Sequence, residues 1–200
     1  LNQRQEAIEH FGNAIQYDPH YAEAYRKRAR LHQIQGNHDA AADDLKQLAI
    51  LEPDNPRIYS QRGQLLLLAG ETDEALKCFA KALEIDPQNV DSLVNRGSLL
   101  ATEGKYEQAA NDFSNAIKLN PDSSAAYNNF AWMLATCNDP NYRDGKRATI
   151  YATKACELMD WKSRDTLDTL AAAAAESDDF QSAIKWQKQA ISLDANNPNE

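Results

Sequence analysis

The stretch VDSLVNRGSLLATEGKYEQAANDFSNAIKLNPDS, residues 90–123, contains the pattern that decides the fold. Its small residue, alanine, aromatic residue and proline each belong to a column that recurs every 34 residues along the chain. The columns are Pro19, Pro53, Pro87 and Pro121; Ala7, Ala41, Ala75 and Ala109; Phe11, Leu45, Phe79 and Phe113; Ala29, Gly63 and Gly97, followed by Ala131; and Arg28, Arg62 and Arg96. Columns that share one register indicate an internal repeat.

Each repeat is predicted to form two helices. The first begins near Ala22, Pro56 and Val90, and it ends at a turn glycine: Gly36, Gly70 or Gly104. Glycine suits that place because it tolerates positive φ, whereas proline cannot continue the second helix. Apolar residues of the second helix follow a period near 3.6 residues. The small residue in the first helix predicts that the two helices approach closely.

This pattern resembles the tetratricopeptide repeat (TPR) family of bacterial type. The matching columns in residues 90–123 are Leu93, Arg96, Gly97, Leu100, Ala109, Phe113, Ala116 and Pro121, with Arg96 where the family has Leu. The resemblance covers essentially the whole chain. It implies an all-α fold, a right-handed α-α superhelix (TPR solenoid) of about five helix pairs plus one N-terminal orphan helix.

The repeat register predicts a single TPR solenoid domain over residues 1–200. Its parts are a half repeat at 1–20, regular repeats at 22–55, 56–89 and 90–123, a repeat at 124–162 with an inserted loop at 137–145, and a C-terminal capping repeat at 163–195. Because residues 3–17 match only a second helix, we expect a fragment of a larger protein. Gln187 falls in the bulky apolar column of the last repeat, which suits a water-facing cap.

Composition excludes several classes of protein. Hydrophobic residues make up 42% and charged residues 26% of the chain, which argues against disorder. The formal net charge of −9 makes nucleic acid an unexpected partner. No apolar run approaches the length of a membrane span, so no membrane insertion is expected. Three cysteines at wide spacing fit neither a disulfide framework nor a metal motif. They suggest a reducing or redox-indifferent location, of which the cytoplasm is favoured.

The sequence contains no recognisable catalytic or metal-binding motif. No phosphate-binding glycine loop, nucleophile elbow or His-Glu-x-x-His motif occurs. The four histidines have no metal-ligand spacing, and the carboxylates of the inserted loop do not alternate as calcium ligands do. We therefore expect no enzyme, no cofactor and no metal.

The family resemblance implies that the first helices line a concave groove that binds a peptide or a helix of a partner. The sixth residue of each first helix is polar: Lys27, Gln61, Asn95 and Asn129. Amides at such positions can donate to and accept from a peptide backbone. The predicted peptide-binding residues are Lys27, Arg30, Gln61, Gln64, Asn95, Ser98, Asn129 and Trp132, with Ser60 and Val94 among their groove neighbours. Simple solvation of these polar residues is the alternative.

Charge suggests what the groove accepts. Arg26, Lys27, Arg28 and Arg30 outnumber Glu23 in the first complete repeat, which predicts a partner of acidic character. The terminal dicarboxylate clamp of some family members is not expected, because the third first helix offers only Asp91 and Asn95. Arg28 and its column are expected to pair with acids on neighbouring helices. Trp132 is either an exposed anchor or packed under the inserted loop.

These observations favour a non-enzymatic protein–protein interaction scaffold. One alternative is a structural module that self-associates through the truncated end, where Ile8, Phe11 and Ile15 would be uncovered. Another is a substrate-recruiting domain of a larger bacterial signalling enzyme.

Overall fold

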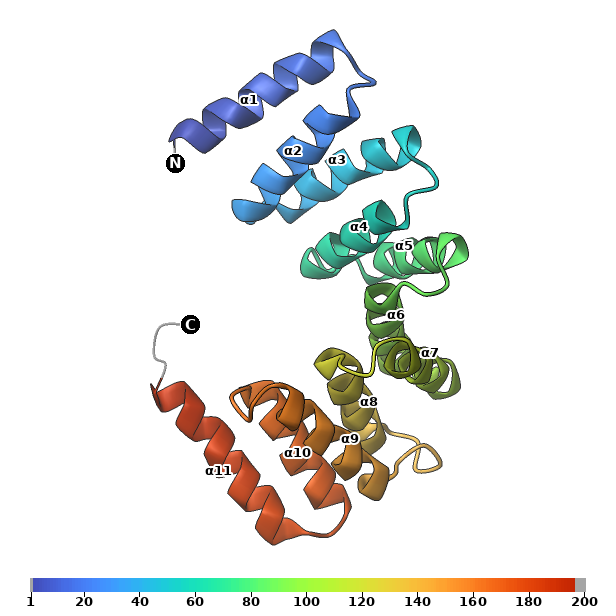
Figure 1. Cartoon of the computed structure of the whole chain (residues 1–200), viewed down its shortest axis with the longest axis vertical. Helices are drawn as coiled ribbons and strands as arrows, with labels where there is room; N and C mark the ends of the chain where they lie inside the picture. The colour runs from blue at the N-terminus through green and yellow to red at the C-terminus, as the bar shows by residue number, and fades with distance from the viewer. Residues whose placement is uncertain (1, 197–200) are drawn as a thin grey trace. The chain divides into compact units, whose positions relative to one another are not determined.

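The computed structural model describes residues 2–196, and within them it contains eleven α-helices and no strand (Figure 1). The helices are α1 (Asn2–Tyr17), α2 (Ala22–Ile34), α3 (His38–Leu51), α4 (Pro56–Leu68), α5 (Thr72–Ile85), α6 (Val90–Thr102), α7 (Tyr106–Leu119), α8 (Ser124–Thr136), α9 (Gly145–Leu158), α10 (Arg164–Glu176) and α11 (Phe180–Asn196). The predicted all-α fold, with one orphan helix before five helix pairs, is confirmed.

The helix ends follow the turn chemistry of the repeat. Gly36, Gly70 and Gly104 have φ values of 77°, 82° and 75°, in the left-handed region that glycine adopts without strain. Asp178 occupies the equivalent turn before α11 with a φ of 60°. Asn55 caps α4, because its side-chain oxygen accepts a hydrogen bond from the Arg57 backbone N–H at 3.2 Å.

Contacts divide the chain into two compact units, unit 1 (residues 1–95) and unit 2 (residues 96–200), with the boundary inside α6. The single-domain arrangement therefore stays a prediction. In unit 1, α1 packs on α2, α2 pairs with α3, and α4 packs on α3 and pairs with α5. The expectation that Ile8 would be uncovered is wrong: Ile8 is buried, and Phe11 and Ile15 are half-buried, because α2 packs on α1.

The small column lets paired helices touch. A Cβ atom on Gly63 of α4 would lie 2.7 Å from the Phe79 ring of α5, and one on Gly97 of α6 would lie 2.9 Å from the Phe113 ring of α7. Both phenylalanines are fully buried. In the first pair the same two positions hold Ala29 and Leu45. Ala29 is larger than the glycine of the other pairs, and Leu45 is smaller than their phenylalanine.

In unit 2, the buried Phe113 and Phe130 and the half-buried Tyr151 join three successive helices. The Phe130 ring of α8 stacks on Phe113 of α7 at 5.6 Å and on Tyr151 of α9 at 5.1 Å between centroids. Trp161, in the turn between α9 and α10, stacks on Trp186 of α11 with 5.3 Å between ring centroids. Tyr25 is buried, whereas Tyr59 and Tyr127, which stand 34 and 102 residues later in the same register, are half-buried.

The inserted loop is one residue shorter than predicted, because α9 begins at Gly145. Gly145 is buried, and an added Cβ would lie 2.6 Å from Ser177 Oγ, so the glycine serves packing rather than a turn. Asp144 caps α9 by accepting a hydrogen bond from the Arg147 N–H at 3.0 Å. The Asn138 N–H donates to the Tyr106 hydroxyl at 3.2 Å, which ties the loop to α7.

The arginine column pairs with acids in two of its three members. Arg28 donates two hydrogen bonds to Asp44, at 2.9 Å from Nε and 2.5 Å from Nη2. Arg96 donates two to Asp112, both at 2.8 Å. The equivalent partner of Arg62 is Cys78, whose Sγ lies 3.5 Å from Nη1. The predicted pairing is therefore confirmed for Arg28 and Arg96 and wrong for Arg62.

Candidate functional site

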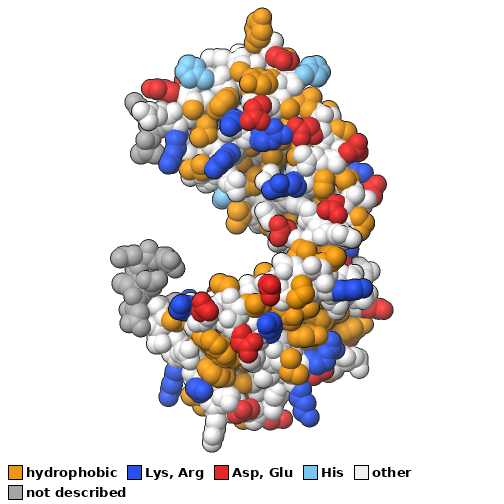
Figure 2. Space-filling view, in the orientation of Figure 1, with side chains coloured by type: hydrophobic (Ala, Val, Ile, Leu, Met, Phe, Trp, Pro, Cys, Tyr) orange, Lys and Arg blue, Asp and Glu red, His pale blue; other side chains and the backbone are white. Residues whose placement is uncertain are grey.

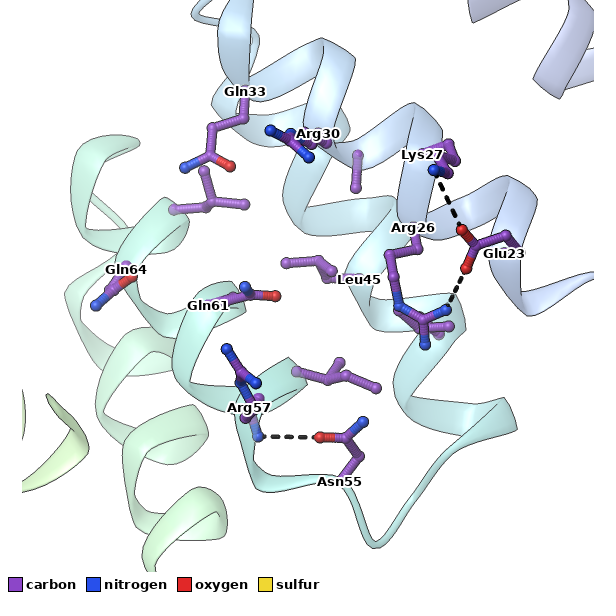
Figure 3. A pocket seen from close by; sticks show the side chains of 14 residues that line it. Glu23, Arg26, Lys27, Arg30, Gln33, Leu45, Asn55, Arg57, Gln61 and Gln64 are labelled. Carbon is purple, nitrogen blue, oxygen red and sulfur yellow. Dashed lines mark hydrogen bonds and ion pairs between the residues drawn. The ribbon is translucent and has the colours of Figure 1, made fainter. Parts of the chain in front are cut away.

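A polar cavity of about 550 Å3 lies between α2 and α4 in unit 1 (Figure 3). Its floor is apolar and includes Leu45 and Leu48 of α3 and Ile58 and Leu65 of α4. Its polar lining comes from the exposed faces of the two first helices and comprises Glu23, Arg26, Lys27, Arg30, Gln33, Asn55, Arg57, Gln61 and Gln64. The structure thus brings the predicted residues Lys27, Arg30, Gln61 and Gln64 to one cavity.

One edge of the cavity is held by ion pairs. Arg26 contacts both Glu23 and Glu52 at 2.6 Å, and Lys27 Nζ lies 3.5 Å from Glu23. The hydrogen bond from Arg26 lowers the pKa of the Glu23 carboxyl. The pKa of Glu52 is lowered as well, first by Asn55 and then by Arg26. The charges of Arg26 and Lys27 are therefore partly offset within the cavity.

Two further cations at the cavity have no acidic partner. Arg30 of α2 and Arg57 of α4 are exposed, and neither side chain forms an ion pair with the residues that the structure describes. Figure 3 shows Arg30, Arg57 and Gln61 projecting over the apolar floor around Leu45. On the face shown in Figure 2, Lys and Arg side chains gather over the first helices of unit 1. The cavity therefore offers two uncompensated positive charges to a ligand.

Arg57 and Asn55 were not predicted as site residues. Arg57 is the second residue of its first helix, the position of Glu23 and Asp91 in the neighbouring repeats. A comparison of that column across repeats would have revealed the change from acid to base.

A second cavity, of about 420 Å3, lies in unit 2 and includes the predicted residues Ser98, Asn129 and Trp132. Tyr106, Phe113, Met133 and Cys137 supply apolar surface to its lining, and Thr102, Thr136 and Asn138 supply further polar groups. The Trp132 side chain is 50% exposed at its rim. Trp132 is therefore an exposed residue beside the loop and is not packed under it.

The amides of the predicted ladder are partly used within the protein. Asn129 Nδ2 donates to Ser98 Oγ at 2.9 Å. Asn95 lines neither cavity, and its Nδ2 donates to the Asp91 carbonyl of the same helix at 2.8 Å. Ser60 and Val94, predicted as groove neighbours, are both buried. The Ser60 side chain faces the next first helix, where its Oγ lies 2.5 Å from Ser92 Oγ. The Asn95 and Asn129 bonds each use one of the two Nδ2 hydrogens, so the internal contacts fix the side chains of Asn95 and Asn129 and leave them part of their hydrogen-bonding capacity.

Within residues 2–196, no group of three or more His, Cys, Asp or Glu side chains is arranged to hold a metal ion. None of the described helices has both the length and the apolar character required to cross a membrane.

Comparison with protein families identifies the chain. Residues 29–200 match the family described as the cilia and flagella-associated protein 70 middle TPR-like domain, and residues 1–56 match the tetratricopeptide repeat. The chain therefore belongs to this family of TPR-like domains. No curated protein matches the sequence.

Solved structures share the fold at low sequence identity. PilW, a widely conserved type IV pilus biogenesis factor, is similar with a TM-score of 0.76 and 21% identity, over 100% of this chain and 88% of PilW. MamA from Desulfovibrio magneticus RS-1 gives a TM-score of 0.73 and 20% identity, over 89% of this chain and 97% of that structure. YrrB, described as a TPR protein with an unusual peptide-binding site, gives 0.68 and 20%, over 96% and 95%. These likenesses agree with the TPR fold.

Proposed function

We propose that the chain is a non-enzymatic protein–protein interaction scaffold whose unit 1 cavity binds an extended, acidic peptide segment of a partner. The observation that carries the proposal is the pair Arg30 and Arg57, two cations without acidic partners above an apolar floor. A peptide carboxylate near them would gain charge-assisted hydrogen bonds at little cost to existing contacts.

The other residues of the cavity suit the backbone of such a peptide. The Gln61 and Gln64 side chains are exposed, and an amide can both donate to and accept from a peptide unit. The floor of Leu45, Ile58 and Leu65 would cover an apolar side chain of the same segment. Membership of the TPR family and the peptide-binding site named for YrrB support a peptide as the ligand class.

The unit 2 cavity is proposed as a separate subsite for an apolar side chain, with Trp132 as its anchor. An exposed tryptophan beside the apolar residues Phe113 and Met133 of this cavity has the character of an interface hot spot. Asn129 is held by its bond to Ser98, and its second Nδ2 hydrogen would donate to the ligand backbone.

The test uses two matched synthetic peptides, one rich in Glu and the other with Gln in place of each Glu. Fluorescence anisotropy should show that the Glu peptide binds and that the Gln peptide binds at least about tenfold more weakly. Arg30→Ala and Arg57→Ala should each weaken binding about three- to thirtyfold.

Arg4→Ala is the matched control, because Arg4 is exposed on α1 and lies outside the cavity. Equal binding of both peptides, or equal binding by the wild type and the Arg30 and Arg57 variants, would contradict the proposal. Circular dichroism establishes that each variant keeps its helix content.

A further inference from the structure

One face of the last helix, α11, differs from the same face of α9, the preceding second helix. Phe180, Ile184 and Ile191 lie along one side of α11 and are 61%, 57% and 58% exposed. Their spacing of four and seven residues places them on one stripe of the helix. Isolated exposed apolar residues are ordinary, but a continuous stripe on one helix face requires an explanation.

The repeat gives that explanation through the equivalent stripe on α9. The equivalent residues lie 35 positions earlier and are Gly145, Thr149, Ala152 and Cys156, matching Phe180, Ile184, Gln187 and Ile191. Ala152 and Cys156 are completely buried. In α9 this stripe is therefore an interface rather than a surface.

Helix α10 contacts the stripe of α9 near both of its ends. An added Cβ on Gly145 would meet Ser177 Oγ at 2.6 Å, and Thr149 Oγ1 lies 3.4 Å from the same oxygen. At the other end the Cys156 thiol interacts with the Thr166 hydroxyl of α10. The stripe on a second helix is thus the place where the following first helix packs.

On α11 no described helix takes that place. Figure 1 shows α11 at the end of unit 2, beside α10. A cavity of about 540 Å3 lies along this side, lined by Ala171 and Ala175 of α10 and Ile184 and Gln187 of α11, with Trp132 at its edge. The small alanine side chains leave room for a helix to approach closely. Figure 2 shows hydrophobic side chains gathered on the visible face of unit 2.

Gln187 is exposed, as the sequence suggested for a water-facing residue, but it is a single polar residue within an apolar stripe. Its Nε2 donates to Asp168 Oδ1 at 2.9 Å, so the amide is held against α10 while apolar residues lie on both sides of it along the stripe. The face is apolar with one satisfied polar group at its centre.

We propose that this face, Phe180, Ile184 and Ile191 with Ala171 and Ala175, binds an amphipathic α-helix of another protein that has acidic residues beside its apolar stripe. The helical form follows from the geometry of the α9–α10 interface, which the face repeats. The acidic flank follows from charge: between Phe180 and Leu193, α11 carries Lys185 and Lys188, both exposed, and no Asp or Glu. This site is separate from the cavity in unit 1.

The test uses a designed helical peptide of about 18 residues with leucines on one face and glutamates beside them, and a matched peptide with lysine in place of glutamate. Titration of isotope-labelled protein should shift amide resonances of α10 and α11, with a dissociation constant of about 0.1–1 mM for the glutamate peptide. The lysine peptide should bind several-fold more weakly at low salt.

The double variant Ile184→Lys/Ile191→Lys should weaken binding at least about tenfold. Ile150→Lys is the control, because Ile150 is 65% exposed on α9 outside the stripe, and it should bind as the wild type does. Absent shifts, shifts confined to other helices, or equal binding by the double variant would overturn the proposal. So would a concentration-dependent dimer that the double variant abolishes, since the face would then belong to a second copy.

The proposal for the α11 face and the proposal for the unit 1 cavity can be contradicted independently of each other. Arg30→Ala and Arg57→Ala should leave the binding of the helical peptide unchanged. The stripe variants should leave the binding of the extended Glu peptide unchanged.

Discussion

Arg62 Nη1 lies 3.5 Å from Cys78 Sγ, at the position where Arg28 and Arg96 each meet an aspartate. The Arg62 Nε atom is buried and has no hydrogen-bond partner among the described residues. Cys78 is 4% exposed, while Asp44 and Asp112 are 3% and 5% exposed, so the three sites differ in chemistry rather than in burial. The middle repeat therefore lacks a charge-assisted pair that its neighbours have.

Cys78→Asp should restore that pair. A carboxylate at this place can accept two hydrogen bonds from Arg62, as Asp44 does from Arg28, and we expect the free energy of unfolding to rise by about 1 kcal/mol. Chemical denaturation followed by circular dichroism measures the change. Asp112→Cys is the matched control and should lower stability. A loss of stability in Cys78→Asp would show that desolvation of the new charge outweighs the pair.

Gly63→Ala should destabilise the protein despite the higher helix propensity of alanine. The new Cβ would lie 2.7 Å from the Phe79 ring, and the overlap should cost more than the roughly 1 kcal/mol gained in propensity. Adding Phe79→Leu should recover stability, because the double variant reproduces the Ala29 and Leu45 pair of the first repeat. Thermal unfolding compares the variants, and additive effects of the two substitutions would contradict this account.

Asp178→Gly should stabilise the turn before α11. Asp178 has a φ of 60°, and glycine stands at the same place in the three regular repeats. Removing the Cβ penalty of the left-handed conformation should raise stability by about 1 kcal/mol. Gly104→Asp is the reverse control and should lower the melting temperature by a similar amount. Unchanged stability in both variants would show that neither turn is strained.

Glu23→Gln should tighten binding of the Glu-rich peptide. Glu23 pairs with Arg26 and approaches Lys27, so its removal frees positive charge at the edge of the unit 1 cavity. Because the side chains are exposed, we expect a gain of about two- to fivefold at low salt, fading as salt rises. Anisotropy titrations at two ionic strengths measure it. Weaker binding would indicate that Glu23 positions Arg26 for the ligand.

The three thiols should react slowly in the native protein. Burial raises the pKa of Cys78, Cys137 and Cys156, so at pH 8 each is mainly the neutral thiol, which is not the nucleophile. A thiol reagent should therefore modify them quickly only after denaturant is added. Rapid modification of the folded protein at pH 8 would contradict this expectation.

The sequence predicted the helices well because the 34-residue columns report contacts inside each pair. Gly97 and Phe113, or Arg96 and Asp112, meet within one repeat, so the same spacing recurs wherever the contact does. The starts of α2, α4 and α6 were predicted at the residues where they occur.

The site was predicted less completely because its details depend on contacts between repeats. The burial of Ser60 comes from Ser92, a residue of the next first helix. The internal use of Asn129 likewise comes from Ser98 on the preceding first helix. The column pattern reports contacts inside a repeat and not these contacts between first helices of neighbouring repeats. The Ser60 and Asn129 side chains therefore could not be placed from the sequence.

The matched residues Gly63 with Phe79 and Ala29 with Leu45 set limits on how such a chain can recombine. In each match the larger residue, Phe79 or Leu45, lies on the second helix, which follows the glycine turn. The partners of the arginine column, Asp44, Cys78 and Asp112, lie on the second helix as well. A crossover at a proline turn would exchange whole pairs and keep every match intact. A crossover at a glycine turn would place Phe79 against Ala29, or Cys78 against Arg28. Duplication and shuffling of this gene should therefore be tolerated mainly at proline turns.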